Sequence, residues 1–138
     1  MDLSKPLPLP TPQTQPFWDA AREHKLVAPR CADCGTTFLY PAPTCPNCLG
    51  ETFGWEQLSG RGVVYSCTVV RQALHPAFRA EVPYVFAIIE LEEGMRMASN
   101  VIECDPEEVH PDQPVEVVFE EASETITLPK FRPVVAAR

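Results

Sequence analysis

Four cysteines arranged as two C-x2-C pairs are the residues of this sequence best suited to chemistry. Cys31 and Cys34 form the first pair, Cys45 and Cys48 form the second, and ten residues separate the two pairs. Each pair places two thiolates on one tight turn, and the segment between them has the length of a hairpin that brings the turns together. Four thiolates fill the tetrahedral coordination of zinc, so we expect a structural zinc ion and not a catalytic one.

Three other uses of paired cysteines have to be compared with zinc. A disulfide framework needs an oxidising compartment, and the N-terminus has neither the basic nor the apolar region of a secretory signal. A thioredoxin-type redox motif uses a single C-x-x-C at the start of a helix. Iron in a rubredoxin-like site also takes four thiolates, so the choice between zinc and iron stays open at this point.

The remaining reactive side chains do not form a catalytic set. Cys67 lies in a predicted strand and Cys104 at a strand end, and we interpret both as packing residues. His75 lies in a long loop, where we expect hydrogen bonds of a turn to satisfy it. The sequence has no Ser-His-Asp order, no glycine-rich phosphate loop and no second carboxylate set for a metal. We therefore do not expect the chain to be an enzyme on its own.

The balance of charge differs between the two halves of the chain. Its 138 residues carry 11 Lys and Arg against 19 Asp and Glu, a formal net charge of −8. Residues 1–69 hold five basic and six acidic groups, whereas residues 70–138 hold six and thirteen. Nucleic-acid-binding modules draw most of their affinity from clustered Lys and Arg, so we expect no nucleic-acid partner. An anionic ligand should meet the first half or an isolated arginine.

The length and the hydropathy pattern limit the class of protein further. A chain of this length holds one compact core with at most a small appendage. The longest mostly apolar stretch, residues 82–89, is far too short for a membrane-spanning helix. Because no export signal is present either, we expect a cytoplasmic protein without a membrane partner.

The elements that must position the cysteines can be outlined from composition and periodicity. Alternating prolines mark residues 1–15 as an extended arm, and Pro16 then opens a short amphipathic helix predicted over residues 16–27. A zinc ribbon is predicted over residues 28–57. We expect a mainly β chain that ends in a five-stranded OB-fold barrel over residues 58–138, with an open five-stranded sheet as the alternative. Its predicted strands are residues 62–70, 84–91, 95–102, 115–119 and 125–128, with one helical turn within 105–111.

The order of helix, four-cysteine ribbon and barrel comes with a series of short motifs. They are Phe17-Trp18, Cys31-x-x-Cys34-Gly35, Cys45-Pro46-x-Cys48, Trp55, Ser59-Gly60-x-Gly62, Val64-Tyr65-Ser66, His75-Pro76-Ala77-Phe78, Pro83-Tyr84-Val85, Glu90-Leu91-x-Glu93-Gly94, Ser99-Asn100, Cys104-Asp105-Pro106 and Leu128-Pro129-x-Phe131-Arg132-Pro133. Taken together and in this order, they resemble the acyl-CoA-associated family of zinc-ribbon plus OB-fold proteins, long catalogued as a domain of unknown function. One departure is Leu49-Gly50, because the family pattern places a glycine directly after the fourth cysteine.

The resemblance implies an accessory subunit and not a self-sufficient enzyme. Members of this family look like companions of thiolase-fold proteins, which include polyketide-type acyltransferases and lipid-transfer-protein-like aldolases of steroid side-chain breakdown. Others accompany hydratases of the MaoC type. By this resemblance the chain would stabilise a thiolase-fold partner in a hetero-oligomer and help to form its acyl-CoA site. A free-standing acyl-CoA-binding module is the alternative.

A chain that contacts CoA needs cations for its phosphates and an aromatic side chain for its adenine. Arg61 lies in the glycine-flanked turn Gly60-Arg61-Gly62, which permits close approach of the backbone. Arg30 belongs to the basic cluster that starts at Arg22. The candidate CoA-binding residues are Arg61, Arg30, Phe38 and Arg132.

Overall fold

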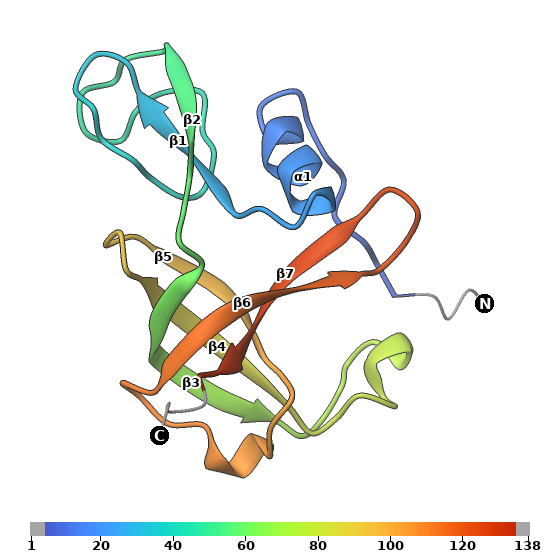
Figure 1. The fold of residues 1–138 in the computed structure, drawn as a ribbon. Helices are drawn as coiled ribbons and strands as arrows, with labels where there is room; N and C mark the ends of the chain where they lie inside the picture. The colour runs from blue at the N-terminus through green and yellow to red at the C-terminus, as the bar shows by residue number, and fades with distance from the viewer. Residues whose placement is uncertain (1–4, 135–138) are drawn as a thin grey trace.

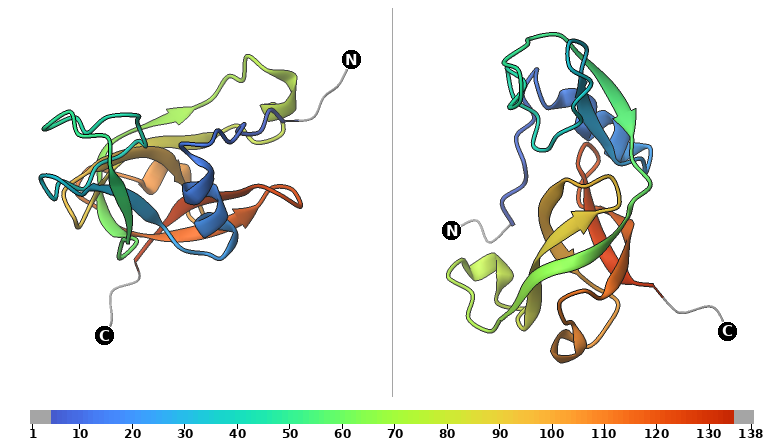
Figure 2. Two further views of the ribbon diagram at one scale, coloured as in Figure 1. Left: turned by 90° about the horizontal axis from the view of Figure 1, so that it is seen from above. Right: turned by 90° about the vertical axis from the view of Figure 1, so that its left-hand side faces the viewer.

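A computed structural model describes residues 5–134 of the chain as a small ribbon stacked on a β-barrel (Figure 1). The ribbon consists of two antiparallel strands, β1 and β2, and the barrel of five. The helix α1 lies beside the ribbon, over the β6–β7 end of the barrel (Figures 1 and 2). The elements are α1 (Gln15–Arg22), β1 (Val27–Cys31), β2 (Phe53–Gln57), β3 (Arg61–Val70), η1 (Pro76–Phe78), β4 (Tyr84–Leu91), β5 (Arg96–Val101), η2 (Pro106–Glu108), β6 (Pro114–Glu121) and β7 (Thr127–Pro133).

The helix is shorter than the predicted segment 16–27. It begins with Pro16 in its first turn, as expected, but ends at Arg22. His24 then takes a positive φ of 61°, and the chain is extended again from Val27 to reach the ribbon. Three helical turns would leave no residues for that reversal, so the sheet ends the helix early. Phe17 and Ala21 are the two buried residues of α1.

The five barrel strands close in the order β3-β4-β5-β7-β6, with β6 pairing back to β3. This closed order confirms the predicted OB-fold, and the alternative of an open sheet is wrong. Strand β4 shows how the interior of the barrel is filled. Every second residue along it points inward and is almost completely buried, namely Val85, Ala87, Ile89 and Leu91. Phe131 fills the centre of the barrel with no exposed surface.

Strands β5 and β7 meet along a seam that is joined by very few backbone contacts. They run parallel and are paired only at Val101 and Phe131 within the described chain. Strand β7 extends to residue 133, beyond the predicted end at 128, although it contains Pro129 and Pro133. Pro129 and Pro133 each lie two residues from Phe131, so the backbone groups of all three residues face the same neighbouring strand. The Phe131 carbonyl faces β5 and accepts from the Ile102 amide at 2.8 Å. The missing N–H groups of the two prolines therefore fall on the seam and not on the ladder to β6.

One hydrogen bond closes the base of the ribbon, and another joins the ribbon to the barrel. The Leu58 amide donates to the Leu26 carbonyl at 2.7 Å, which ties the exit from β2 to the entry of β1. The Ala98 amide of β5 donates to the Tyr40 hydroxyl of the ribbon at 2.6 Å, on the seam side of that strand. The ribbon therefore satisfies a backbone group that β7 leaves unpaired.

Candidate functional site

The four predicted ligands converge at the end of the ribbon farthest from the barrel. Their Sγ atoms all lie within 4.8 Å of one another, with 3.5 Å between Cys31 and Cys48 and 3.6 Å between Cys34 and Cys45. Four sulfurs at the usual Zn–S distance of about 2.3 Å in a tetrahedron lie about 3.8 Å apart. The observed spacing therefore fits one tetrahedral ion without rearrangement. Among residues 5–134 this is the one cluster of such ligands.

Two turns of the same geometry carry the two cysteine pairs. In the first, the Gly35 amide donates to the Cys31 carbonyl at 2.9 Å. In the second, the Leu49 amide donates to the Cys45 carbonyl at the same distance. The backbone amide of Asn47 also points at the Cys45 sulfur, 3.4 Å away. These turns aim all four sulfurs at one point because each reverses the chain just after its second cysteine.

The departure from the family pattern at Leu49-Gly50 has a structural consequence. Leu49 occupies the place that Gly35 holds in the first turn, and both have a left-handed backbone, with φ of 65° and 76°. A leucine pays a conformational cost for that backbone which glycine does not. Gly50 is needed for a different reason, because a Cβ there would lie 3.3 Å from the sulfurs of both Cys31 and Cys48.

The pKa values of two of the thiols, Cys34 and Cys48, are displaced in opposite directions. Hydrogen bonding, chiefly with the Thr36 side chain, lowers the pKa of Cys34 to about 5. A hydrogen bond with the Gly50 backbone acts to lower the pKa of Cys48 as well. The thiols that neighbour Cys48, first among them Cys31, outweigh it and raise this pKa to about 12. Cys34 is thus a thiolate at neutral pH, which prepares the cluster for a cation.

Phe38 lies inside the ribbon and not at a ligand-accessible surface. Its ring is 6% exposed and packs edge-on against Phe53, 5.5 Å between centroids. The sulfurs and Phe53 cover the Phe38 ring, so in this structure it has little exposed surface for an adenine. Its role is to pack beneath the metal site.

Arg61 and Arg132, two of the three candidate arginines, are brought to one face of the barrel. Glu116 of β6 lies between them, because it is paired with Arg61 of β3 on one side and with Arg132 of β7 on the other. Arg132 pairs with Glu116 at 2.9 Å, and Arg61 pairs with Glu92 at 3.0 Å. Hydrogen bonding to Glu116 raises the pKa of Arg132. A CoA phosphate at this face would have to compete with these carboxylates.

The third candidate arginine, Arg30, belongs to a different surface. It lies on β1 of the ribbon and pairs with Glu56 of β2 at 3.7 Å. The structure therefore separates Arg30 from the pair formed by Arg61 and Arg132.

The other reactive side chains have structural partners. The Cys67 sulfur points to the Val109 carbonyl at 3.8 Å, and burial raises the pKa of the Cys104 thiol. His75 accepts a hydrogen bond from the Ala77 amide at 3.0 Å and so caps η1. Within residues 5–134, no histidine is hydrogen-bonded to a serine, threonine or cysteine side chain. No nucleophile–base pair of the usual kind is thus assembled.

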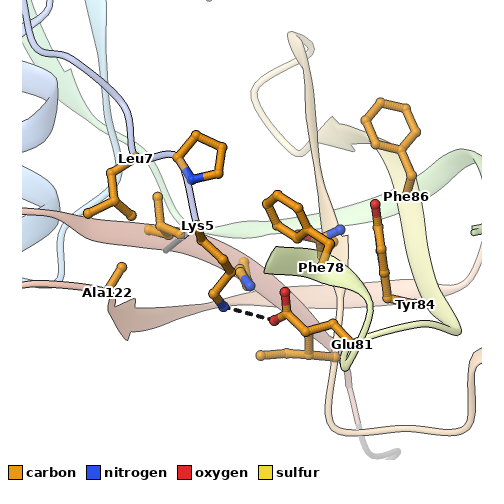
Figure 3. Close-up of a pocket in the computed structure, with 12 residues that line it drawn as sticks. Lys5, Leu7, Phe78, Glu81, Tyr84, Phe86 and Ala122 are labelled. Carbon is orange, nitrogen blue, oxygen red and sulfur yellow. Dashed lines mark hydrogen bonds and ion pairs between the residues drawn. The ribbon is translucent and has the colours of Figure 1, made fainter. Parts of the chain in front are cut away.

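Sequence analysis missed a groove of about 620 Å³ on the barrel wall (Figure 3). Phe78, Tyr84 and Phe86 line one side, and residues 5–7 of the arm line the other. The alternation on β4 was the available signal, since Tyr84 and Phe86 must point outward if Val85 and Ala87 point inward. The two lysines of the groove are paired with Glu81 and Glu120, so it presents no free positive charge for a nucleic acid.

No helix among the described residues combines the length and the apolar character needed to span a membrane.

Two family models match the chain in adjacent segments. The first, described as the rubredoxin-like zinc ribbon domain of ChsH2, matches residues 18–54. The second, described as the C-terminal OB-fold domain of ChsH2, matches residues 55–120. Together they cover the ribbon and most of the barrel.

Curated relatives include scaffold proteins and enzyme subunits. A DUF35 domain-containing scaffold protein of Methanocaldococcus jannaschii is 42% identical over 100 residues, which cover 72% of this chain and 70% of the relative. A probable enoyl-CoA hydratase alpha subunit of Thermomonospora curvata is 42% identical over 122 residues, 86% of this chain but only 37% of that relative. The benzoylsuccinyl-CoA thiolase subunit BbsA of Thauera aromatica is 34% identical over 86 residues, 56% of each chain.

One solved structure matches the chain over nearly its whole length. It is a chain of the Ltp2-ChsH2(DUF35) aldolase, 37% identical, with a TM-score of 0.85. The match covers 94% of this chain and 100% of that chain.

Proposed function

This chain belongs to the ChsH2/DUF35 family of zinc-ribbon and OB-fold proteins, and we propose that it is a non-catalytic accessory subunit of a thiolase-fold acyl-CoA enzyme. The observation that carries the proposal is the end-to-end match to a chain of the Ltp2-ChsH2(DUF35) aldolase. Similarity to a subunit of benzoylsuccinyl-CoA thiolase supports the same class of partner. The role is to bind the partner enzyme and stabilise it in the cytoplasm, where thiols stay reduced.

The reactive side chains of this subunit are consistent with a non-catalytic role. Its four cysteines would hold a zinc ion whose coordination they fill, so the ion supplies folding energy and no open position for water. His75 is used as a helix cap, and Cys67 is directed at a backbone carbonyl. With these groups engaged, the reacting atoms must be supplied by the partner.

We further propose that the chain helps to form the partner's acyl-CoA site through Arg61 and Arg132. The two side chains flank Glu116 and are both about half exposed or more. A phosphate that approaches them would replace exposed carboxylate partners, and such exposed ion pairs are worth only about 0–1 kcal/mol each. The alternative is that the isolated chain binds acyl-CoA by itself.

Co-expression with a thiolase-fold protein encoded beside it tests the assembly. We expect the two proteins to co-elute on size exclusion and the partner to lose stability or activity when it is made alone. A Cys45→Ser variant should lose the complex because the ribbon loses a ligand, whereas Cys67→Ser removes a cysteine outside the cluster and should keep it. Failure to co-elute, together with full activity of the lone partner, would contradict the proposal.

Calorimetry with acyl-CoA separates the two versions of the CoA proposal. If this chain only completes a shared site, the isolated chain gives no heat and the complex does. In the complex, Arg61→Gln with Arg132→Gln should weaken binding, whereas Arg71→Gln, whose pairing with Glu107 lies elsewhere, should not. Heat of binding from the isolated chain would favour the free-standing module.

A further inference from the structure

The groove on the barrel lies where OB-folds generally receive their ligands. That position is the face of the second and third barrel strands together with the loops that follow the first and fourth. Here these elements are β4, β5, the loop between β3 and β4, and the loop between β6 and β7. The groove takes lining residues from all four, including Phe78, Phe86, Asn100 and Ala122. The described OB-fold therefore keeps a ligand face that the metal site does not use.

The lining of the groove suits an apolar, extended peptide. Phe78, Tyr84 and Phe86 stand along one side as flat surfaces, and Phe86 is still 44% exposed. Ile102 and Leu128 add aliphatic surface. Aromatic-lined grooves of this kind bind proline-rich segments, because such segments already hold the polyproline II conformation and lose little entropy on binding.

The opposite wall of the groove is made by such a segment of the same chain. Residues 5–10 read Lys-Pro-Leu-Pro-Leu-Pro, and Lys5, Pro6 and Leu7 line the groove. Figure 3 shows the arm facing the aromatic side chains, with the Lys5 ammonium and the Glu81 carboxylate joined across the groove at 2.9 Å. Leu7 is 37% exposed, whereas Leu9, two residues later in the same arm, is 89% exposed. The Lys5–Glu81 ion pair thus ties the arm to the barrel, Leu7 borders the groove, and Leu9 lies in solvent.

We propose that this face of the barrel is a binding site for an extended proline–leucine segment, and that residues 5–7 of the chain's own arm cover part of it in the free protein. The contact is weak, because it consists of one exposed ion pair and of Leu7, which keeps 37% of its surface exposed. The chain connection to α1 keeps the arm at high local concentration. A ligand that covers the whole face must displace the arm first.

The anchor of the arm is independent of the groove. The Thr11 amide donates to the Thr14 hydroxyl at 2.9 Å, and the Gln15 amide donates to the Thr11 carbonyl at 2.7 Å. This turn starts α1 and holds the arm where residues 5–7 reach the barrel. Substitutions at residues 5–9 can therefore free the arm without altering the start of the helix.

Fluorine NMR of the full-length protein labelled with 3-fluorotyrosine tests the occupancy. The chain has three tyrosines, and only Tyr84 lines this groove, so Tyr40 and Tyr65 serve as internal controls. We expect Leu7→Ser to shift the Tyr84 resonance alone and Leu9→Ser to leave all three unchanged. An unchanged Tyr84 resonance in Leu7→Ser would overturn the proposal. If dilution of the wild type moves its Tyr84 resonance to the position found in Leu7→Ser, the arm docks on a second copy of the chain. That outcome also overturns the proposal.

Binding of a labelled peptide with the sequence of residues 4–11 tests the site itself. Because the arm competes with the added peptide, full-length Lys5→Glu/Leu7→Ser should bind it roughly tenfold more tightly than the wild type, measured by fluorescence anisotropy. Leu9→Ser should bind it as the wild type does. Adding Phe86→Ala to the double variant should abolish binding, and circular dichroism of that variant reports whether the barrel stays folded. If the peptide binds the double variant equally well with and without the Phe86→Ala substitution, the groove is not its binding site.

Discussion

The ribbon and the barrel are folded by different forces. The buried core of the ribbon consists of Cys31, Phe38 and Cys45, and two of these three are metal ligands. The barrel strands supply nine buried apolar residues to one continuous core, among them Val64, Ile89 and Phe131. A three-residue core cannot offset the conformational entropy of about thirty residues. The comparison predicts that the ribbon takes its stability from metal coordination and the barrel from burial.

Removing the metal should produce the largest effect. Structural zinc contributes roughly 10–16 kcal/mol of apparent binding free energy in small peptides, far more than one buried side chain. We expect Cys45→Ser, or a chelator, to abolish metal binding and amide protection in β1 and β2 while β4 and β6 stay protected. Hydrogen exchange with mass spectrometry and metal analysis measure both, with Cys67→Ser as the control. Equal loss of protection in β4 would show that the two parts unfold as one unit.

Truncating the centre of the barrel should have the next largest effect, in the other region. Phe131→Ala leaves a cavity at a position with no exposed surface and should lower the free energy of unfolding by about 3–5 kcal/mol. The metal content in native buffer should stay the same, because Phe131 does not touch the cysteine cluster. Urea denaturation gives the first quantity, and Leu74→Ala, at a 93% exposed position, is the matched control. Loss of metal from Phe131→Ala would break the comparison.

Relieving the left-handed leucine should stabilise the ribbon by a smaller amount. Leu49→Gly removes a conformational cost of about 1 kcal/mol at a side chain that is mostly in solvent. We expect tighter metal retention against a chelator, with no change in the unfolding of the barrel. Leu49→Ala keeps the strained backbone and should show no gain. An equal gain in both variants would assign the effect to the apolar side chain instead.

Acid should weaken the Arg61–Glu92 ion pair at the start of the barrel, and this effect should be the smallest. Hydrogen bonding from Ser59 and Arg61 holds the pKa of Glu92 below its usual value of 4.5, so its contribution to stability is present above that pH and is lost as the pH falls through the lowered pKa. The difference in urea midpoint between the wild type and Glu92→Gln should therefore shrink on acidification. Glu124→Gln, in the turn before β7, is the control. A difference that is constant with pH would contradict this assignment.

Sequence patterns were sufficient where spacing alone determines geometry. The two C-x2-C pairs predict the ligand cluster because a knuckle is a local turn, and alternation along β4 predicts its inward face for the same reason. The closed barrel followed from five short strands that need to hide their edges. The first two features depend on residues that are close together in the chain, and the third on the number of strands.

Features built from distant segments were not accessible in this way. Phe38 is near the cysteines in sequence, but whether its ring faces solvent depends on Phe53 of the other strand. Arg61 and Arg132 became neighbours only through the register of β6 between them. The groove combines the arm with segments from five later parts of the chain. The end of α1 at Arg22 depends on the position of β1, which local propensity does not contain.

The hydrogen bond between the Ala98 amide and the Tyr40 hydroxyl links metal supply to solubility. Strand β5 has almost no partner on its β7 side, so its amides there could pair with a strand of another molecule. The Tyr40 hydroxyl occupies the Ala98 amide of that row, and it can do so only while the cysteine knuckles hold the ribbon in shape. A cell starved of zinc would thus face more than an unfolded ribbon: it would accumulate barrels with an open edge, which are prone to aggregate.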